Sequence, residues 1–179
     1  FGSKIIGAGS YKTVYDLGNN FILKVSEHPE YTTEIKKEIE IKKCAGSKYL
    51  TKILAYDKKG FHWLITEKVK TISYNNLDLF VETIAKLLKG SDFLQKSVWT
   101  SVRYSNEEEK VSINELQGEA FIEEFVHYLY ESQNERDVKS RWLQGLIDVI
   151  KTCGIDPRDL YHRNWGIRPQ TNEPVILDY

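Results

Sequence analysis

Three polar residues near the C-terminal end of this 179-residue chain, Asp159, Asn164 and Asp178, most constrain what it can fold into. Asn164 stands five positions after Asp159, and Asp178 directly follows the short apolar run 175–177. Carboxylate and amide oxygens are suitable ligands for Mg²⁺, and a further carboxylate can accept a proton from a hydroxyl group. The three residues together suit phosphoryl transfer, in which magnesium is held against phosphate groups.

The composition is that of a globular protein without an excess of either charge. Apolar residues make up 41% of the chain, which is enough to build a packed core. The 25 basic and 26 acidic residues leave a formal net charge of −1, so no broad positive field is available to bind nucleic acid or an anionic membrane. No apolar run approaches the length of a membrane span. We therefore expect a soluble, cytoplasmic protein with no nucleic-acid and no membrane partner.

The two cysteines match neither a metal site nor a disulfide framework. Cys44 and Cys153 fall on expected helices, and neither belongs to a short cysteine motif. We therefore expect both side chains to be ordinary, partly buried thiols in a reducing compartment.

The first 69 residues alternate short strand patterns with a single helix. A helix is expected over residues 31–45, ended by Gly46. The segment Gly18-Asn19-Asn20 predicts a tight turn, because glycine and asparagine tolerate positive φ. Five β-patterned runs are expected, at residues 3–7, 13–17, 21–25, 49–56 and 61–69. The order is strand, strand, strand, helix, strand, strand.

From residue 70 onward the pattern becomes mainly helical. Apolar residues recur at spacings of three and four, which is typical of one buried helix face. Helices are expected over residues 75–90, 114–131 and 142–153. Residues 165–168 and 174–177 then predict a final hairpin. The sequence therefore predicts an α+β chain in two parts.

The N-terminal part contains a second group of candidate functional residues. Gly7 and Gly9 form a turn in which backbone N–H groups can approach phosphates, although an ordinary hairpin explains the same glycines. Lys24 is flanked on both sides by apolar residues, so it must either snorkel to solvent or meet an anion. Glu34 and Glu38 share one face of the next helix. We favour Glu38 as the partner of Lys24, because it lies mid-helix beside apolar positions.

In their order along the chain, these motifs resemble those of the protein-kinase-like fold, which protein kinases share with aminoglycoside-type small-molecule kinases. A glycine-rich loop is followed by a strand lysine, a helix glutamate, a hinge, an Asp-x-x-x-x-Asn loop and a metal-binding Asp. The resemblance implies a bilobal α+β fold. Its N-lobe, residues 1–69, holds a five-stranded antiparallel sheet and one helix. Its C-lobe, residues 70–179, is mainly helical, carries a catalytic-loop hairpin and is truncated after the metal-binding Asp.

The resemblance also implies the use of ATP and Mg²⁺ and a role for individual residues. Asp159 is the expected catalytic base, and Asn164 and Asp178 are the expected magnesium ligands. Lys24, held by Glu38, is expected to contact the α- and β-phosphates. The other expected nucleotide-binding residues are the glycines of the loop, the apolar walls of the adenine pocket and the hinge backbone: Gly7, Gly9, Val14, Ile22, Glu67 and Val69.

The sequence departs from the pattern of protein kinases in three places. Lys12 stands near the third glycine of the loop, where its cation either tightens nucleotide binding or stiffens the loop. Pro157 replaces the family's usual His ahead of Arg158 and Asp159. Nothing follows Tyr179, where protein kinases continue into their substrate-binding helices. In this respect the chain is more similar to compact kinase-like proteins of bacteria and their phages, for which the expected location is the bacterial host cytoplasm.

Two functions are compatible with these residues. The first is a phosphotransferase that moves the γ-phosphate of ATP to a hydroxyl group of a protein or a small molecule. The alternative is a pseudokinase, which binds a nucleotide or a partner without turnover. The absent substrate-binding helices also make a homo-oligomer possible, because they leave apolar surface for a second chain to cover.

Overall fold

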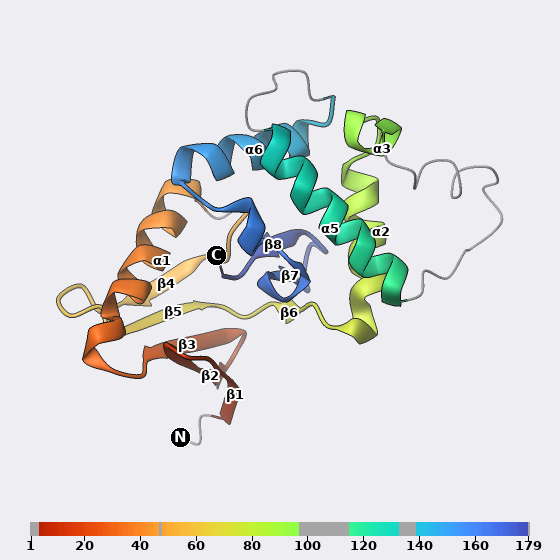
Figure 1. The fold of residues 1–179 in the computed structure, drawn as a ribbon. Helices are drawn as coiled ribbons and strands as arrows, with labels where there is room; N and C mark the ends of the chain where they lie inside the picture. The colour runs from red at the N-terminus through yellow and green to blue at the C-terminus, as the bar shows by residue number, and fades with distance from the viewer. Residues whose placement is uncertain (1–3, 47, 97–114, 133–138, 179) are drawn as a thin grey trace. The chain divides into compact units, whose positions relative to one another are not determined.

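The computed structural model describes residues 4–46, 48–96, 115–132 and 139–178. The chain divides into two compact units, Phe1–Lys70 and Thr71–Tyr179. Figure 1 traces the first unit in red to yellow and the second in green to blue. Among the described helices, none combines the length and the apolarity that a membrane crossing requires.

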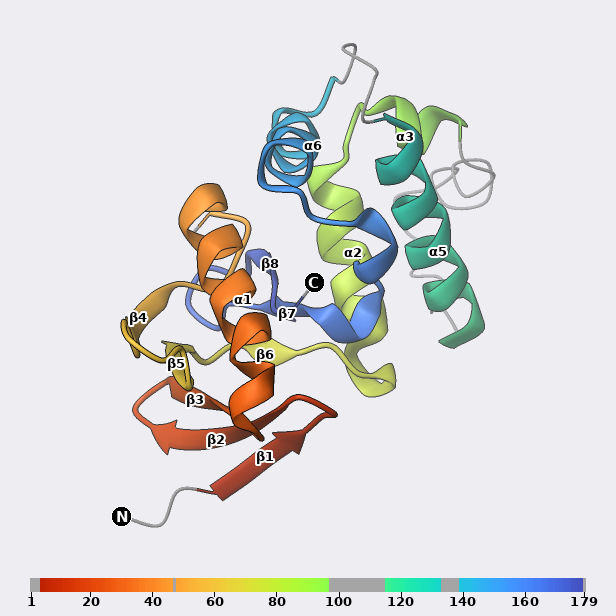
Figure 2. The same cartoon turned by 60° about the vertical axis from the view of Figure 1, so that its left-hand side comes forward.

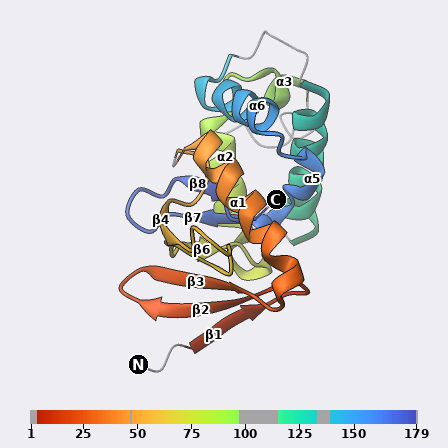
Figure 3. The same ribbon diagram turned by 90° about the vertical axis from the view of Figure 1, so that its left-hand side faces the viewer.

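The first unit is built on a five-stranded antiparallel sheet, as expected. The strands are arranged in the order β1-β2-β3-β5-β4, and Figure 3 shows the antiparallel run of the first three. Their bounds are β1 Lys4–Ala8, β2 Lys12–Gly18, β3 Phe21–Ser26, β4 Ile53–Tyr56 and β5 Trp63–Glu67. The last two strands are shorter than predicted. Phe61 has a positive φ of 56°, which is incompatible with an extended strand, so β5 begins only after it.

The turn between β2 and β3 follows the prediction from its residue types. Gly18, Asn19 and Asn20 have φ values of 75°, 50° and 65°, a conformation that these residues tolerate better than most others. The Asp16 side chain accepts a hydrogen bond of 2.9 Å from the backbone N–H of Gly18. This turn fixes the register in which β3 pairs with β2.

A single helix, α1 (Thr32–Ala45), crosses one face of this sheet (Figure 2). A short 3-10 turn over Pro29–Tyr31 precedes it, so the helix begins one residue later than predicted. Ile35 and Ile39 pack against Leu64 of β5 to form the core of the unit. The helix also buries Glu38 and Lys42. Two charged side chains on the buried side of a helix are uncommon, and they mark a site where function competes with packing.

The second unit is mainly helical. Its helices are α2 Leu77–Leu87, α3 Asp92–Lys96, α5 Glu115–Glu131 and α6 Arg141–Cys153. A 3-10 turn at Tyr74–Asn76 takes up the beginning of the first predicted helix. Trp165, whose exposed fraction is 1%, packs between the rings of Phe80 and Phe125 at centroid distances of 5.6 and 6.5 Å. These aromatic contacts anchor the segment that follows α6 against α2 and α5.

A small sheet closes the chain. β7 (Trp165–Ile167) and β8 (Pro174–Ile176) pair antiparallel, and the short strand β6 (Lys70–Thr71) lies beside β7. The backbone N–H of Ile72 donates to the carbonyl of Trp165 at 3.1 Å. The strand β6 was not expected, because two residues carry no readable periodicity.

The expectation about the cysteines is wrong. Both Cys44 and Cys153 are disulfide-bonded, and neither is a free thiol. The residues stand 109 positions apart (153 − 44) on separate helices, so no local spacing signals a disulfide. The inference of a reducing compartment therefore loses its support from the cysteines.

Replacing Gly154 by Ala tests the end of α6. Gly154 has a φ of 67° and a ψ of 35°, and its N–H donates to the carbonyl of Ile150. A Cβ atom is strained in this left-handed conformation, so we expect Gly154→Ala to lower the free energy of unfolding by about 1 kcal/mol. Gly154→Asn is the matched control and should cost less. Urea denaturation measures both variants, and equal stability of Gly154→Ala and wild type would contradict the prediction.

Candidate functional site

The nucleotide-binding residues predicted for the strands of the first unit lie on one face of its sheet. Val14 of β2 is paired with Lys24 of β3 on one side and with Gly7 of β1 on the other. Ile22 stands two positions before Lys24 and therefore points to the same face. Lys24 is also paired with Leu64, which packs against α1. The strand register thus places these side chains on the sheet face that α1 covers.

Lys24 and Glu38 form a buried ion pair. The Lys24 Nζ atom lies 2.5 Å from Oε1 of Glu38, and the exposed fractions of the two side chains are 6% and 3%. Glu34, the alternative partner, is exposed to solvent. The expected contact between Lys24 and Glu38 is therefore present. A buried lysine held by a carboxylate is a charged group kept in a fixed position, which is what binding a phosphate requires.

Two further lysines share the carboxylate of Glu38. Lys12, the first residue of β2, places its Nζ 2.8 Å from Oε2. Lys42, one turn further along α1, places its Nζ 3.5 Å from Oε1 and donates a hydrogen bond to the Thr51 hydroxyl. Sequence reasoning had noted Lys12 as a cation in the loop but had not joined it to Glu38, and it had missed Lys42. Lys42 was accessible from its i,i+4 spacing to Glu38.

The three ammonium groups keep Glu38 ionised. Burial alone raises the pKa of Glu38, but the charges of Lys24, Lys12 and Lys42 outweigh it and hold the pKa well below its ordinary value of 4.5. The folded protein therefore retains this negative charge under conditions in which an unfolded chain would accept a proton. This difference makes the cluster a contributor to stability that depends on pH.

The pH dependence of stability follows from this lowered pKa. At neutral pH both states carry the ionised carboxylate, so the advantage of wild type over Glu38→Gln is fully present. As the pH falls below 4.5, the unfolded chain binds a proton that the folded state does not, and the advantage shrinks. We expect the difference in unfolding free energy to be constant above about pH 5.5 and to decrease below it. Denaturation at a series of pH values measures it, and a difference that stays constant down to about pH 3 would contradict the lowered pKa.

The glycines of the first turn are not required by the packing of the chain itself. Neither Gly7 nor Gly9 has a positive φ. A Cβ at Gly7 would lie 3.8 Å from Val14, and one at Gly9 would lie 3.8 Å from the carbonyl oxygen of Lys12, which are ordinary contacts. The N–H of Gly9 donates to this same carbonyl at 2.9 Å and closes the turn. Glycine at these positions is therefore better explained by the close approach of another molecule than by internal strain.

The segment after β5 contains the predicted hinge. The N–H of Glu67 donates to the carbonyl of Lys52 at 3.0 Å, and its side chain accepts from the Lys52 N–H at 2.8 Å. A base contact from the Glu67 backbone would therefore come from its carbonyl. Val69 follows as a buried residue. Thr66 was not predicted as a side-chain contact. Its hydroxyl is buried without a hydrogen-bond partner among the described residues, and Thr66 is paired with Ile22, which places it on the same face.

In the second unit, Asp159 ends a tight 3-10 turn over Pro157–Asp159. The Asp156 side chain caps this turn by accepting a 2.9 Å hydrogen bond from the Arg158 N–H, and it also binds the Arg158 guanidinium at 2.6 Å. The indole N–H of Trp165 donates to the carbonyl of Leu160 at 2.7 Å. Asp159 is exposed on a loop that is thus fixed on both sides.

The Asn164 side chain joins this loop to the end of the chain. Its Nδ2 atom donates to the carbonyl of Asp159 at 2.6 Å, which leaves its Oδ1 atom directed elsewhere. The Asn164 carbonyl accepts a 2.8 Å hydrogen bond from the N–H of Leu177, the residue before Asp178. The backbone therefore brings Asn164 and Asp178 to adjacent places at the end of the β7–β8 pair.

The chemistry of these two residues fits magnesium. An amide oxygen and a carboxylate are hard oxygen ligands, and Mg²⁺ is commonly bound by only one or two protein groups, with phosphate oxygens and water completing the octahedron. Within the described ranges, no cluster of three or more His, Cys, Asp or Glu side chains is arranged to hold a metal alone. Any magnesium bound at Asn164 and Asp178 would therefore depend on further oxygen ligands.

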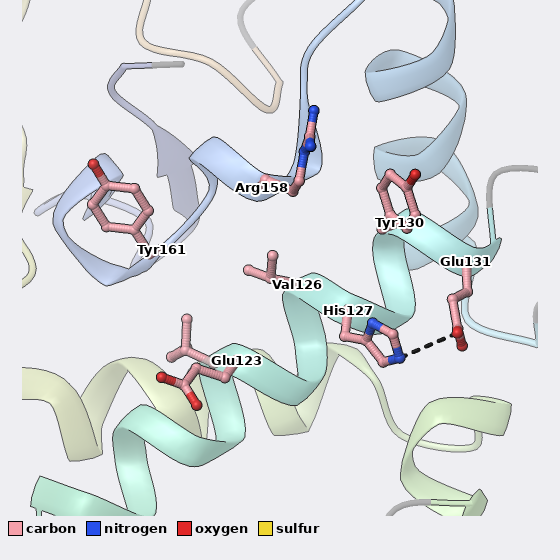
Figure 4. Close-up of a pocket in the computed structure, with 8 residues that line it drawn as sticks. Glu123, Val126, His127, Tyr130, Glu131, Arg158 and Tyr161 are labelled. Carbon is pink, nitrogen blue, oxygen red and sulfur yellow. Dashed lines mark ion pairs between the residues drawn. The ribbon is translucent and has the colours of Figure 1, made fainter.

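A groove of about 550 Å³ lies in the second unit beside the Asp159 loop (Figure 4). Arg158 and Tyr161, which bracket Asp159 in the sequence, contribute one wall. The other wall is the face of α5 that carries Glu123, His127 and Tyr130. None of the predicted site residues lines this groove, and sequence reasoning had no signal for it, because its walls come from segments some thirty residues apart.

Comparison with known proteins gives little further information. No protein-family model matches the chain, and no curated protein matches it. Among solved structures, the chain is similar to the streptomycin–ATP–APH(2″)-IIa ternary complex, with 13% sequence identity and a TM-score of 0.41. That match covers 99% of this chain and 65% of the other, so the chain spans about two thirds of the length of that protein. We therefore base the function on the residues of this chain.

Proposed function

We propose that this protein is an ATP- and magnesium-dependent phosphotransferase of the protein-kinase-like class. The observation that carries the proposal is the buried ion pair between Lys24 of β3 and Glu38 of α1. It occurs in a five-stranded antiparallel sheet whose single helix is inserted between the third and fourth strands. A lysine is costly to bury, and a binding site for phosphates gives it a reason to be there.

The first unit supplies the nucleotide-binding groups. Lys24 contacts the α- and β-phosphates, and Glu38 keeps its ammonium group in place. The backbone of the Gly7–Gly9 turn covers the phosphates. The carbonyl of Glu67 and the backbone of Val69 face the adenine. Apolar contacts to the base come from two residues on the same sheet face, Val14 and Ile22.

The second unit supplies the groups that act on the transferred phosphate. Asn164 and Asp178 would hold Mg²⁺, which when bound neutralises phosphate charge and orients the triphosphate. Asp159 accepts the proton of the acceptor hydroxyl as its oxygen forms a bond to the γ-phosphorus. The bond from that phosphorus to the β–γ bridging oxygen breaks, and ADP leaves with the electron pair. Both a protein hydroxyl and a small-molecule hydroxyl are compatible acceptors.

Radiolabelled ATP tests this activity. The purified chain is incubated with γ-labelled ATP, Mg²⁺ and a generic protein or aminocyclitol acceptor, and label is followed in inorganic phosphate, in the acceptor and in the chain itself. We expect transfer or hydrolysis by wild type and a loss on the order of 10²-fold or more in Asp159→Asn. A wild-type chain that binds ATP but shows no hydrolysis, autophosphorylation or transfer would reject the enzyme.

That same outcome would favour the pseudokinase alternative, for which one observation speaks. The Lys12 ammonium occupies the second oxygen of Glu38, at a loop position where the family has glycine. Thermal denaturation separates the two functions. ATP bound to the native state raises the melting temperature by mass action, and a catalytic site that uses Asn164 and Asp178 predicts a larger rise with Mg²⁺ present. A rise that is independent of Mg²⁺ favours the pseudokinase.

A further inference from the structure

Lys12 is held in a defined place by its own backbone. It is the first residue of β2, and its carbonyl accepts the hydrogen bond from the Gly9 N–H that closes the glycine turn. The preceding carbonyl, that of Tyr11, accepts a 3.0 Å hydrogen bond from the N–H of Glu27. The main chain on which Lys12 stands is therefore fixed at the turn that we assign to the phosphates.

The side chain of Lys12 points to the same sheet face as that of Lys24. Val14 is paired with Lys24, and Lys12 stands two residues before Val14, so the alternation of a strand directs all three to one side. The ammonium groups of Lys12 and Lys24 bind the two different oxygens of Glu38, at 2.8 and 2.5 Å. One carboxylate thus positions two cations side by side.

The two lysines differ in their access to solvent. The exposed fraction is 18% for the Lys12 side chain and 6% for that of Lys24. Lys12 therefore forms the outer edge of the charge cluster, and Lys24 and Lys42 form its interior. Ammonium groups that share one carboxylate repel each other, and a polyanion bound beside them relieves that repulsion.

We propose that Lys12 is a second phosphate-binding cation, which Glu38 holds beside Lys24 so that the two lysines together select for a nucleotide with a charged polyphosphate. This inference rests on the proposed nucleotide site and adds to it a residue that determines specificity. Lys12 recognises the charge of the phosphates and contributes nothing to binding the base or the ribose. It therefore separates ATP from adenosine and AMP.

Calorimetric titration of ATP, AMP and adenosine, with Mg²⁺ present, tests the inference. We expect Lys12→Met to weaken ATP binding at least about tenfold and to leave adenosine binding within about twofold of wild type. Lys12→Arg, which keeps the charge, should retain ATP affinity within a few-fold. Lys36→Met is the matched control, because Lys36 lies exposed on α1 in a long ion pair of 3.9 Å with Glu40. Its affinities should equal those of wild type.

Two results would overturn the inference while leaving the proposed function intact. One is ATP affinity that is unchanged in Lys12→Met but lost in Lys24→Met. The other is an equal loss of ATP and adenosine affinity in Lys12→Met, which would mean that Lys12 only supports the fold around Glu38. Absence of ATP binding in wild type would reject the proposed function and this inference together. If Lys12→Met does not fold, as judged by circular dichroism, Lys12→Gln takes its place and the same ratios decide.

Discussion

Replacing Asp178 by Asn is expected to lower the rate of phosphate release or transfer from ATP by on the order of 10³-fold. The variant keeps the size of the side chain and one oxygen, but it removes the negative charge that binds Mg²⁺ beside Asn164. Without this charge the metal and the triphosphate are not aligned, and alignment together with charge neutralisation supplies most of the catalysis in phosphoryl transfer. Radiolabelled ATP at saturating Mg²⁺ measures the loss.

The matched control for this prediction is Asp148→Asn. Asp148 is an exposed carboxylate on α6 that accepts a hydrogen bond from Gln144, so its replacement removes the same charge from the same unit at a neutral place. We expect this variant to retain wild-type turnover. If Asp178→Asn were as active as Asp148→Asn, Asp178 would have no role in the reaction and the assignment of the metal site would be wrong.

Replacing Glu38 by Gln is expected to produce the largest loss of stability, about 3–5 kcal/mol of unfolding free energy. The change leaves Lys12, Lys24 and Lys42 without the carboxylate that they share, in a place where the Glu38 side chain is only 3% exposed. Buried charges that lose their partner cost more than the pair contributes, although a lysine that gives up its proton can recover part of the loss.

Chemical denaturation measures this loss, and Glu40→Gln provides the comparison. Glu40 lies two positions along the same helix, is exposed, and has only a long contact with Lys36. Surface ion pairs of this kind contribute little, so we expect a change within about 0.5 kcal/mol. A Glu38→Gln variant that lost less than about 1 kcal/mol would show that the buried cluster is not the structural centre of the first unit.

The ion pair between Lys24 and Glu38 could be predicted from the sequence because each residue broke a local pattern. Lys24 interrupts an apolar strand, and Glu38 stands among apolar residues in the middle of a helix. Such local conflicts are readable, since each has few physical explanations. The order of strands and the position of α1 were accessible for a similar reason, because they depend on alternation and on turn residues.

The remaining members of the cluster could not be predicted, because their positions depend on tertiary packing. Lys42 is one of several lysines on α1, and only the packing of that helix on the sheet decides which of them is buried. Thr66 looks like any strand residue until its hydroxyl is found without a partner. The disulfide-bonded state of Cys44 and Cys153 was missed for the same reason, because pairing between distant helices leaves no local pattern.

The most direct test of the central claim is calorimetric titration of the intact chain with ATP, in the presence and in the absence of Mg²⁺. We predict that Mg²⁺ tightens ATP binding by at least about tenfold in wild type. We predict that Asp178→Asn loses this enhancement, and that Lys24→Met weakens ATP binding under both conditions. ATP binding that is undetectable in wild type, or that Mg²⁺ tightens equally in wild type and Asp178→Asn, would contradict a site in which the lysine of the first unit and the acidic residue of the second act on one nucleotide.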